Sequence, residues 1–225
     1  GLIIKQARDQ GIDQPILGGD GFDSPGLLEK AGAAALNQVY FTNHYSSLDQ
    51  DPTVQDFIKA FKEAKRFGLN PIAVTDEKAS NYTTTPAEGS FTVDPAATYF
   101  HYTPNETIGG VEFGYIPETG DVPLVADMSS TILSRPLDVS KFGVIYAGTQ
   151  KNMGPAGMAV VIVRDDLLDR ARPSTPSIWQ YRAMADADSM LNTPPTFSIY
   201  LLGKILAWVE KNGGLADMAE RNQAK

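Results

Sequence analysis

The chain has 225 residues, a formal net charge of -8 and a sequence pI of about 4.7. Such an acidic chain lacks the basic surface that nucleic acids or anionic membranes bind. The absence of cysteine excludes disulfides, thiolate metal sites and cysteine nucleophiles, and no apolar stretch has the length of a membrane span. We expect a cytoplasmic globular protein without a targeting signal, whose partners are at most small molecules.

The first third of the chain predicts alternating helices and strands. Apolar spacing and helix-start signals predict helices over residues 2–10, 24–32 and 51–68. Between them, residues 15–19 and 39–45 have strand patterns, the second rich in aromatic and β-branched side chains. This order is typical of a mainly parallel sheet covered by helices.

The middle of the chain continues the alternation less regularly. Short apolar runs predict strands over residues 71–75, 98–102 and 123–127. Polar residues 81–94 predict a loop, and residues 103–106 a turn.

The last third predicts two more strands and then helices. Apolar runs over residues 144–147 and 158–163 predict buried strands. Residues 165–172 predict a short helix, residues 174–195 an irregular segment, and residues 197–211 an amphipathic helix. The whole pattern predicts one α/β domain over residues 1–225, a three-layer sandwich around a mixed, mostly parallel central sheet.

Lys151 lies between the two last apolar runs, in a segment of glycine, proline and small residues. A lysine held between buried strands is costly unless its amine is neutral, paired or covalently bound. One use of such a lysine is an imine with an aldehyde cofactor. The alternative, which the lysine alone favours, is a loop-tip residue with its ammonium group in water.

Asp127 ends the predicted strand at residues 123–127. Ligands gather at the carboxyl ends of parallel strands, where a carboxylate can hold a cationic ring nitrogen. The alternative is that Asp127 caps the turn formed by the next residues. Lys151 and Asp127 are therefore the minimal pair for pyridoxal phosphate, with an amine for the imine and an acid for the pyridinium nitrogen.

Four long motifs stand out in the later part of the chain. They are His101-Tyr-Thr-Pro-Asn-Glu-Thr-Ile-Gly-Gly-Val, Ala126-Asp-Met-Ser-Ser-Thr-Ile-Leu-Ser-Arg-Pro, Tyr146-Ala-Gly-Thr-Gln-Lys-Asn-Met-Gly-Pro-Ala-Gly and Asn192-Thr-Pro-Pro-Thr. With these motifs, the chain from about Phe61 to Lys225 resembles the phosphoserine aminotransferase family. The resemblance implies a cofactor-binding domain of a pyridoxal-phosphate transferase of serine biosynthesis.

The resemblance also implies roles for single residues. Lys151 would form the imine with the cofactor, and Asp127 would pair with the pyridine nitrogen. Thr107 would hydrogen-bond near the phenolic oxygen, and Gln150 would help to hold the phosphate or the ring.

Two further positions, Asn192 and Thr193, would reach the cofactor phosphate of a neighbouring subunit. A homodimer is therefore weighed against a monomer. The two histidines, His44 and His101, lack the spacing of a metal pair, so we expect no metal site.

The beginning of the chain has two motifs of a different kind. They are Gln6-Ala-Arg-Asp-Gln-Gly-Ile-Asp-Gln-Pro-Ile-Leu-Gly-Gly-Asp-Gly-Phe-Asp-Ser-Pro and Val39-Tyr-Phe-Thr-Asn-His-Tyr-Ser-Ser. With them, residues 1–64 are similar to one lobe of a periplasmic branched-chain amino-acid binding protein. The resemblance implies that Asp20 faces a ligand's amino group.

The two resemblances together predict an engineered chimera, with a binding-protein-like segment over residues 1–64 and an aminotransferase-like segment over residues 65–225. In the aminotransferase family, the replaced segment carries a glycine-rich helix start that cradles the phosphate. Asp20 and Asp23 bring negative charge to that place, which opposes a phosphate dianion. The arginine-bearing small domain of the family lies outside this sequence.

Three functions follow as hypotheses. The first is a chimeric scaffold without turnover that binds pyridoxal phosphate at Lys151. The second is an active phosphoserine:2-oxoglutarate aminotransferase. The third is an amino-acid binding module that uses Asp20.

Overall fold

A computed structural model of the chain describes residues 16–18, 39–41, 70–75 and 77–225. The chain divides into two compact units, residues 1–73 and 74–225. The predicted single domain over residues 1–225 stays a prediction. The helices predicted at residues 2–10, 24–32 and 51–68, together with Asp20, Asp23 and His44, lie outside the described residues.

The first unit contains a parallel strand pair. β1 (Ile16–Gly18) pairs with β2 (Val39–Phe41), with Ile16 opposite Val39 and Gly18 opposite Phe41. Both strands fall where the sequence predicts them. Their parallel pairing agrees with the helix–strand alternation, because two parallel strands need a long connection between them.

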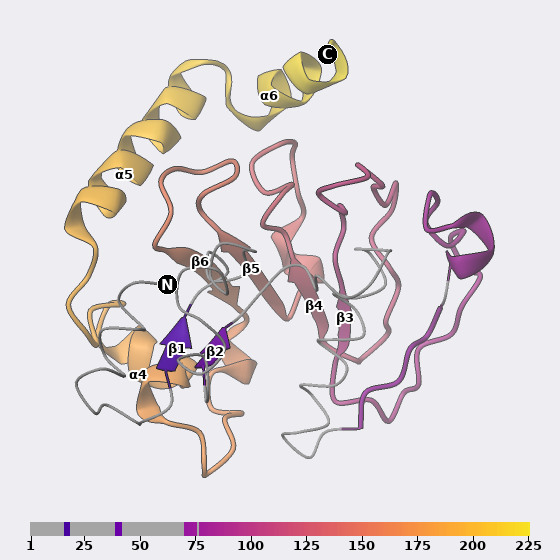
Figure 1. The fold of residues 1–225 in the computed structure, drawn as a ribbon, viewed down its shortest axis with the longest axis horizontal. Helices are drawn as coiled ribbons and strands as arrows, with labels where there is room; N and C mark the ends of the chain where they lie inside the picture. Colours follow the sequence, from indigo (N-terminus) through magenta and orange to yellow (C-terminus); the bar gives the residue numbers. More distant parts are fainter. Residues whose placement is uncertain (1–15, 19–38, 42–69, 76) are drawn as a thin grey trace. The chain divides into compact units, whose positions relative to one another are not determined.

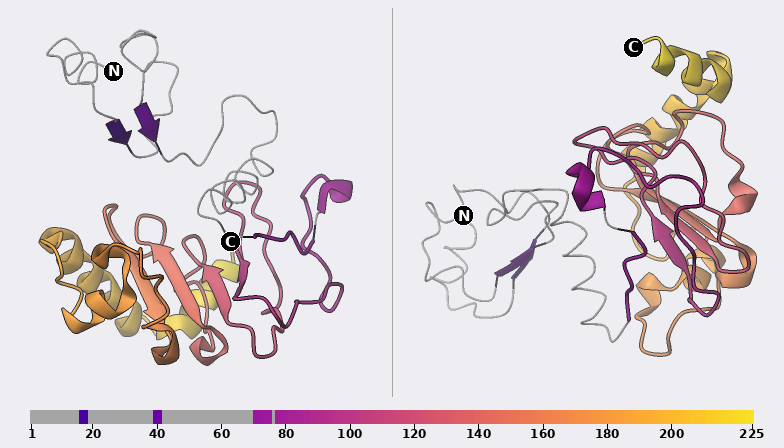
Figure 2. Two further views of the ribbon diagram at one scale, coloured as in Figure 1. Left: turned by 90° about the horizontal axis from the view of Figure 1, so that it is seen from below. Right: turned by 90° about the vertical axis from the view of Figure 1, so that its right-hand side faces the viewer.

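The second unit is built on a sheet of four strands in the order β3-β4-β5-β6 (Figure 1). These are β3 (Phe100–Tyr102), β4 (Leu124–Asp127), β5 (Val144–Gly148) and β6 (Ala159–Val163). β3, β4 and β5 are parallel, whereas β6 runs antiparallel to β5. The strands lie side by side in each view of Figure 2. The predicted α/β class with a mixed, mostly parallel sheet is confirmed.

One face of this sheet forms the core of the second unit. Side chains alternate between the two faces of a strand, and on β4 the residues Leu124 and Ala126 are buried while their neighbours are half-buried. Ala126 pairs with Ile145 of β5, which is only 1% exposed. The buried cluster consists of Tyr102, Leu124, Ala126, Met128, Ile132, Phe142, Ile145, Ala147 and Met153.

Two of the predicted strands differ from the structure. Residues 71–75 have no strand, and Ile72 is 67% exposed, because a short apolar run does not by itself supply a pairing partner. β6 is present but is not buried, since it lies at an edge of the sheet with Val161 43% and Ile162 39% exposed.

Helical segments connect and follow the strands. The 3₁₀ turns are η3 (Glu77–Ser80), η4 (Val139–Lys141), η5 (Asp165–Leu167) and η6 (Ser177–Trp179). The helix predicted at residues 165–172 is thus shorter than expected, and α4 (Tyr181–Asp186) lies in a segment predicted to be irregular. The sequence pattern there is too short and too polar to predict a helix of six residues.

Two helices end the second unit and contact the rest of it. α5 (Thr196–Lys211) falls almost where predicted, and its Leu202 packs against the core cluster. α6 (Gly214–Gln223) follows at once, and Asn222 Nδ2 donates to the carbonyl of Ser134 at 3.0 Å. Among the described residues, no helix combines the length and the apolar character needed to span a bilayer.

Candidate active site

The loop between β5 and β6 carries Lys151. Thr149 begins the loop; it is fully buried, and its hydroxyl donates to the carbonyl of Pro155. Its backbone N–H donates to the Met158 carbonyl at 3.2 Å, and its own carbonyl accepts from Gly154 N at 2.8 Å. These bonds close the loop on itself, so Lys151 sits at a fixed place beyond the carboxyl end of β5.

Lys151 is exposed, as expected for a loop lysine, but its amine has a defined partner. Nζ donates to Thr107 Oγ1 at 2.7 Å. Thr107 belongs to the turn after β3, where the Glu106 carboxylate accepts from the backbone N–H groups of Ile108 and Gly109. A turn whose N–H groups are held by its own carboxylate keeps a rigid shape. The structure therefore brings together two residues, Lys151 and Thr107, that the family resemblance implies for one site.

Asp127 lies at the carboxyl end of β4, one strand away from the Lys151 loop. Its Oδ1 accepts from Ser129 N at 3.0 Å and from Ser129 Oγ at 2.7 Å. Ser129 Oγ in turn accepts from Gly148 N at 3.0 Å. Asp127 thus caps the following turn, as the alternative interpretation predicts. The same bonds also fix its carboxylate beside the end of β5, where a cation-binding group would be needed.

Gln150 lies back over the end of β5. A Cβ atom at Gly148 would come within 2.5 Å of Gln150 Oε1 and 2.9 Å of its Nε2. The space above Gly148 is therefore filled by the Gln150 amide, and a larger residue at Gly148 would displace it. Because Tyr146 and Gly148 alternate with the buried residues of β5, this amide lies on the sheet face that also carries Asp127.

Two aromatic side chains complete this face of the sheet. His101 Nε2 and the Tyr146 hydroxyl are 2.9 Å apart, and their rings stack with centroids 6.0 Å apart. Desolvation lowers the pKa of His101, whereas the negative charge of Asp127 acts in the opposite direction. Desolvation, with Asp127 as the next cause, raises the pKa of Tyr146. Both residues therefore sense the Asp127 charge.

Sequence reasoning did not assign Ser129 or Tyr146 to the site. Tyr146 is paired with Asp127 across adjacent strands and so shares its face. Finding it requires the register between β4 and β5, which the sequence does not supply. The sequence places Ser129 in the turn after Asp127, but its bond with Gly148 N depends on the fold.

The other two predicted cofactor residues lie in a different part of the second unit. Asn192 and Thr193 are exposed in the segment between α4 and α5, where Asn192 Nδ2 donates to the Thr193 carbonyl at 3.4 Å. Their implied role toward a neighbouring subunit stays a prediction.

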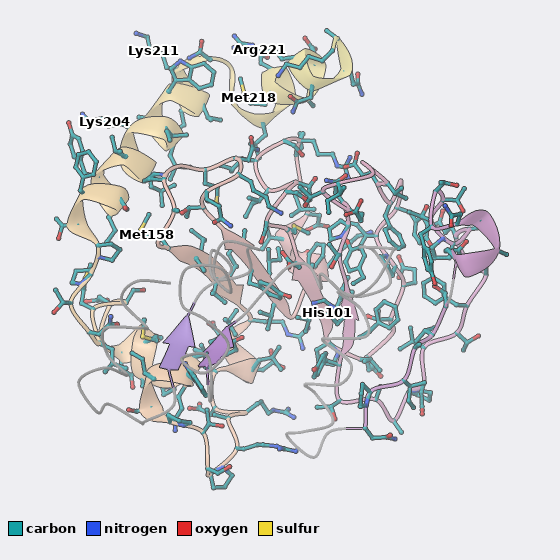
Figure 3. The ribbon with its side chains drawn as sticks, viewed as in Figure 1. His101, Met158, Lys204, Lys211, Met218 and Arg221 are labelled. Carbon is teal, nitrogen blue, oxygen red and sulfur yellow. The ribbon has the colours of Figure 1, made fainter. Side chains whose placement is uncertain are left out.

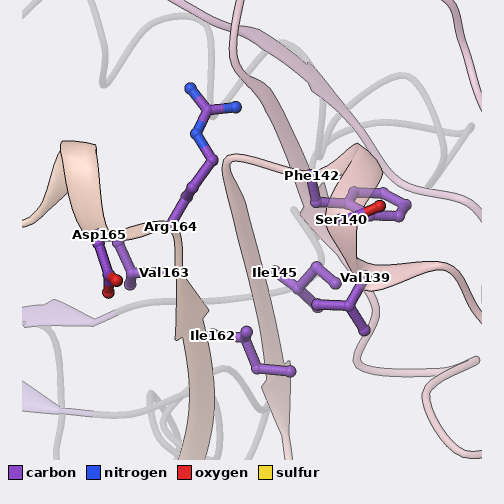
Figure 4. Close-up of a pocket in the computed structure, with 8 residues that line it drawn as sticks. All are labelled: Val139, Ser140, Phe142, Ile145, Ile162, Val163, Arg164 and Asp165. Atoms are coloured by element: carbon purple, nitrogen blue, oxygen red, sulfur yellow. The ribbon is translucent and has the colours of Figure 1, made fainter.

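A pocket in the second unit lies at the other end of β5 (Figure 4). Its walls are mainly apolar, and none of the predicted cofactor residues lines it. It is not the candidate site. The residues that line it are Val139, Ser140, Phe142, Ile145, Ile162, Val163, Arg164 and Asp165.

The groups at the candidate site fit pyridoxal phosphate by their chemistry. An amine is held by the Thr107 hydroxyl at 2.7 Å, a carboxylate is anchored by Ser129, and an amide lies over a glycine. An aldehyde needs the first, a pyridinium nitrogen needs the second, and a ring or phosphate oxygen can use the third. The fit concerns the described residues; the predicted phosphate-side residues Asp20 and Asp23 lie outside them.

The chain is similar in sequence to curated phosphoserine aminotransferases. The phosphoserine aminotransferase of Pseudomonas aeruginosa is 54% identical over 167 residues, which cover 74% of this chain and 46% of that protein. The enzyme of Azotobacter vinelandii is 53% identical over the same length and coverage. The chain thus spans about half the length of the curated relatives it matches.

Two solved structures resemble the chain over a similar share. Phosphoserine aminotransferase from Bacillus circulans subsp. alkalophilus superposes with a TM-score of 0.70 and 44% identity over 74% of this chain and 46% of that one. The pyridoxal-phosphate-bound enzyme from Trichomonas vaginalis gives 0.67 and 43% over 73% and 49%. The aminotransferase class-V family matches residues 58–225, and the chain therefore belongs to the class-V aminotransferase family.

Proposed function

We propose that the chain binds pyridoxal phosphate at Lys151, as a chimeric scaffold that has lost most or all aminotransferase turnover. The observation that carries the binding proposal is the 2.7 Å contact of Lys151 Nζ with Thr107 Oγ1, beside an anchored Asp127. The name of the relatives and the cofactor held by the Trichomonas vaginalis enzyme support the same ligand.

Each described residue of this site would have its own role toward the cofactor. When bound, pyridoxal phosphate supplies an aldehyde that condenses with amines and a ring that withdraws electrons from the attached carbon. Lys151 would hold the cofactor through its amine, which the Thr107 hydroxyl orients. Asp127 would hold the ring nitrogen by a charge-assisted hydrogen bond, and the Gln150 amide at the end of β5 would hold the ring or the phosphate.

The proposed loss of turnover rests on residues 1–64. The class-V match starts at residue 58, and the motifs of residues 1–64 are similar to those of a binding-protein lobe. In the place of a phosphate-cradling helix start, this segment carries Asp20 and Asp23. Negative charge repels a phosphate dianion, and a cofactor that is held loosely loses most of the rate gained from orientation. An active phosphoserine:2-oxoglutarate aminotransferase is the competing proposal.

The test is an absorbance titration of the purified full chain with pyridoxal phosphate. We expect a visible band, which borohydride reduction converts into a stable adduct that peptide mass spectrometry locates on Lys151. The variant Lys151→Ala should lose this adduct. Lys141→Ala is the matched control, because Lys141 is an exposed lysine of η4, which precedes β5, whereas Lys151 follows the other end of that strand. Adducts spread evenly over surface lysines would contradict the proposal.

A second measurement separates the scaffold from the enzyme. Phosphoserine and 2-oxoglutarate are supplied to the cofactor-loaded chain, and glutamate formation is followed. We expect turnover at least about 1,000-fold below that of the Pseudomonas aeruginosa relative, since misplaced reactants lose several powers of ten in rate. Turnover within a factor of ten of that relative would establish the active enzyme instead.

A further inference from the structure

Three short segments follow the parallel strands β3, β4 and β5, each at the carboxyl end of its strand. We call them the β3 turn (residues 103–113), the β4 turn (residues 128–134) and the β5 loop (residues 149–158). The β5 loop carries Lys151 and ends at Met158, which Figure 3 labels just before β6. Backbone hydrogen bonds fold each segment on itself. The placement of one segment against another therefore depends on the side-chain bonds between them.

The contact between Lys151 and Thr107 joins two of these segments. Nζ on the β5 loop donates to Oγ1 on the β3 turn at 2.7 Å, although both side chains are exposed. A hydrogen bond that water can replace has a small net free energy, and ordering a lysine side chain costs conformational entropy. This bond is therefore too weak to hold the two segments together by itself, and other contacts must fix the distance between them.

The first of these contacts is made by Asn152, the neighbour of Lys151 in the chain. Its Nδ2 donates to the carbonyl of Ile132 at 2.6 Å, which ties the β5 loop to the β4 turn. Ile132 is 8% exposed and belongs to the buried cluster. Met153, which follows Asn152, is buried in the same cluster. The backbone after Lys151 is thus held both by the core and by an acceptor that the core keeps in place.

The second contact joins the β3 turn to the β4 turn. Asn105 Nδ2 donates to Ser130 Oγ at 2.9 Å, and the same hydroxyl donates to the Asn105 carbonyl at 2.9 Å. A serine hydroxyl can donate one hydrogen bond while it accepts another. Both residues are half-buried, and Asn105 lies two residues before Thr107. The β3 turn is thus tied at the point where it leads to Thr107.

The β4 turn is the centre of this arrangement, because it is bonded to both other segments. It starts directly after Asp127, the last residue of β4. Ser129 of this turn donates to Asp127 and accepts from Gly148 N at the end of β5. A shift of the β5 loop against the β4 turn would therefore change the distance between the Lys151 amine and the Asp127 carboxylate.

We propose that Asn105 and Asn152 are positioning residues of the cofactor site. Asn152 holds the β5 loop, which carries Lys151, against the β4 turn. Asn105 holds the β3 turn, which carries Thr107, against the same segment. Both act through the Lys151 amine, whose place they fix relative to Asp127. This inference rests on the proposed function, because it concerns the same lysine and the same cofactor.

The first test needs no cofactor and measures how available the Lys151 amine is in the full chain. Trace acylation followed by peptide mass spectrometry gives the labelling rate of Lys151 relative to the exposed Lys141. Asn152→Leu removes the donor without adding charge, and Thr107→Val removes the hydroxyl that accepts from Nζ. We expect either change to raise the relative rate by about twofold to tenfold, the factor that corresponds to one net hydrogen bond.

The double variant shows whether Asn152 acts through the lysine contact. Asn152→Leu and Thr107→Val both release the same amine, so their effects on the labelling rate should not add. Fully additive effects would mean that Asn152 influences Lys151 by another route, and they would overturn the proposal.

A second test uses Ser130, where loss and rescue can be compared at one position. Ser130→Ala removes both bonds to Asn105, whereas Ser130→Thr keeps the hydroxyl that makes them. We expect the labelling rate of Lys151 to rise in the alanine variant and to return to the original value in the threonine variant. If Asn152→Leu does not fold, this pair decides alone, and an unchanged rate in folded Ser130→Ala would overturn the proposal.

The matched control is Asn222→Leu. Asn222 Nδ2 donates to the carbonyl of Ser134 at 3.0 Å, so it too ties a distant segment to the β4 turn. That segment is α6, which carries none of the predicted cofactor residues. Its loss should leave the labelling rate of Lys151 unchanged. A rise as large as that of Asn152→Leu would show that any loosening of the β4 turn frees the amine, which contradicts a specific role of the two asparagines.

The cofactor arm titrates pyridoxal phosphate into the full chain and its variants. Borohydride reduction and peptide mass spectrometry then give the share of adduct on Lys151. We expect Asn152→Leu and Ser130→Ala to weaken the affinity by about fivefold or more, since each loses a bond that places the amine, and to spread the adduct over other lysines. Ser130→Thr and Asn222→Leu should keep the original affinity and adduct position.

This arm separates the inference from the proposed function. If the original chain does not bind the cofactor at Lys151 while the labelling results hold, the proposed function fails and the positioning of the amine stands. If the chain binds at Lys151 and all folded variants keep the same affinity and adduct position, the positioning role fails and the proposed function stands.

Discussion

The two faces of the β3–β6 sheet differ, because one forms the apolar core and the other carries polar groups. On one face Leu124, Ala126 and Ile145 are almost completely buried. On the other, Asp127 and Tyr146 alternate with them along the same strands and are only half-buried. Because side chains alternate along a strand, each residue that stabilises the core places its neighbour on the opposite face. The core face therefore sets the positions of the polar groups without touching them.

The core face can be tested with Ile145→Ala, which gives the largest expected effect. Ile145 is 1% exposed and belongs to the buried cluster. Deleting a fully buried isoleucine side chain removes apolar burial and leaves a cavity, at a cost of about 2–5 kcal/mol in the free energy of unfolding. Chemical denaturation followed by circular dichroism measures this loss.

The matched control for Ile145→Ala is Val161→Ala on the exposed edge strand β6. Val161 is 43% exposed, so its truncation should cost about 1 kcal/mol or less. Equal losses in the two variants would mean that the faces of the sheet do not differ in the way described.

The polar face can be tested with Ser129→Ala. Its hydroxyl donates to Asp127 and accepts from Gly148 N, and it thereby joins the ends of β4 and β5. We expect a loss of about 1–2 kcal/mol in the free energy of unfolding, since the change leaves Gly148 N without this acceptor. Cofactor affinity should fall as well, because Asp127 loses one of its two fixed donors.

The chain offers a matched motif for this variant. Asp138 and Ser140 repeat the same turn, with Ser140 N at 3.1 Å and Ser140 Oγ at 2.6 Å from Asp138 Oδ1. That turn is exposed and does not join two strand ends, so Ser140→Ala should have a smaller effect on stability and none on cofactor affinity. A larger loss of stability from Ser140→Ala than from Ser129→Ala would show that the Ser129 bonds on the polar face contribute no more than those of an exposed turn.

Much of the second unit was predictable from local patterns. The strands that carry the core residues and the helix α5 fall where the apolar spacing predicts them, because burial imposes that spacing directly. The exposure of β6 was not predictable, since an apolar run does not tell whether a strand lies inside a sheet or at its edge. The strand predicted at residues 71–75 is absent for a related reason, because a strand needs a pairing partner that a local sequence pattern cannot identify.

The candidate site was predictable only where one residue carries a recognisable chemistry. Lys151 and Asp127 stand out because an amine and an acid follow apolar runs, and the family resemblance adds Thr107 and Gln150. The supporting contacts of Ser129, His101 and Tyr146 depend on strand register and on the fold of a turn. Neither the register nor the turn can be predicted from a short segment of sequence, so the roles of these residues become evident only when the strands are aligned.

The smallest expected effect concerns the stability of the polar face at acidic pH. The pKa of His101 in the folded chain is lowered mainly by desolvation, whereas the unfolded chain titrates near the ordinary value of about 6.5. The unfolded state therefore binds more protons than the folded state as the pH falls below about 6.5, and stability decreases down to the folded pKa. His101→Gln should remove this decrease between pH 7 and pH 5. Denaturant midpoints of the original chain and the variant, measured across that range, report the difference directly, and parallel curves would show that His101 titrates alike in both states. Carboxylates with lowered pKa values, such as Asp166, lose their contribution only at lower pH, and His44 is present in both chains, so the difference between the two curves in this window reports His101.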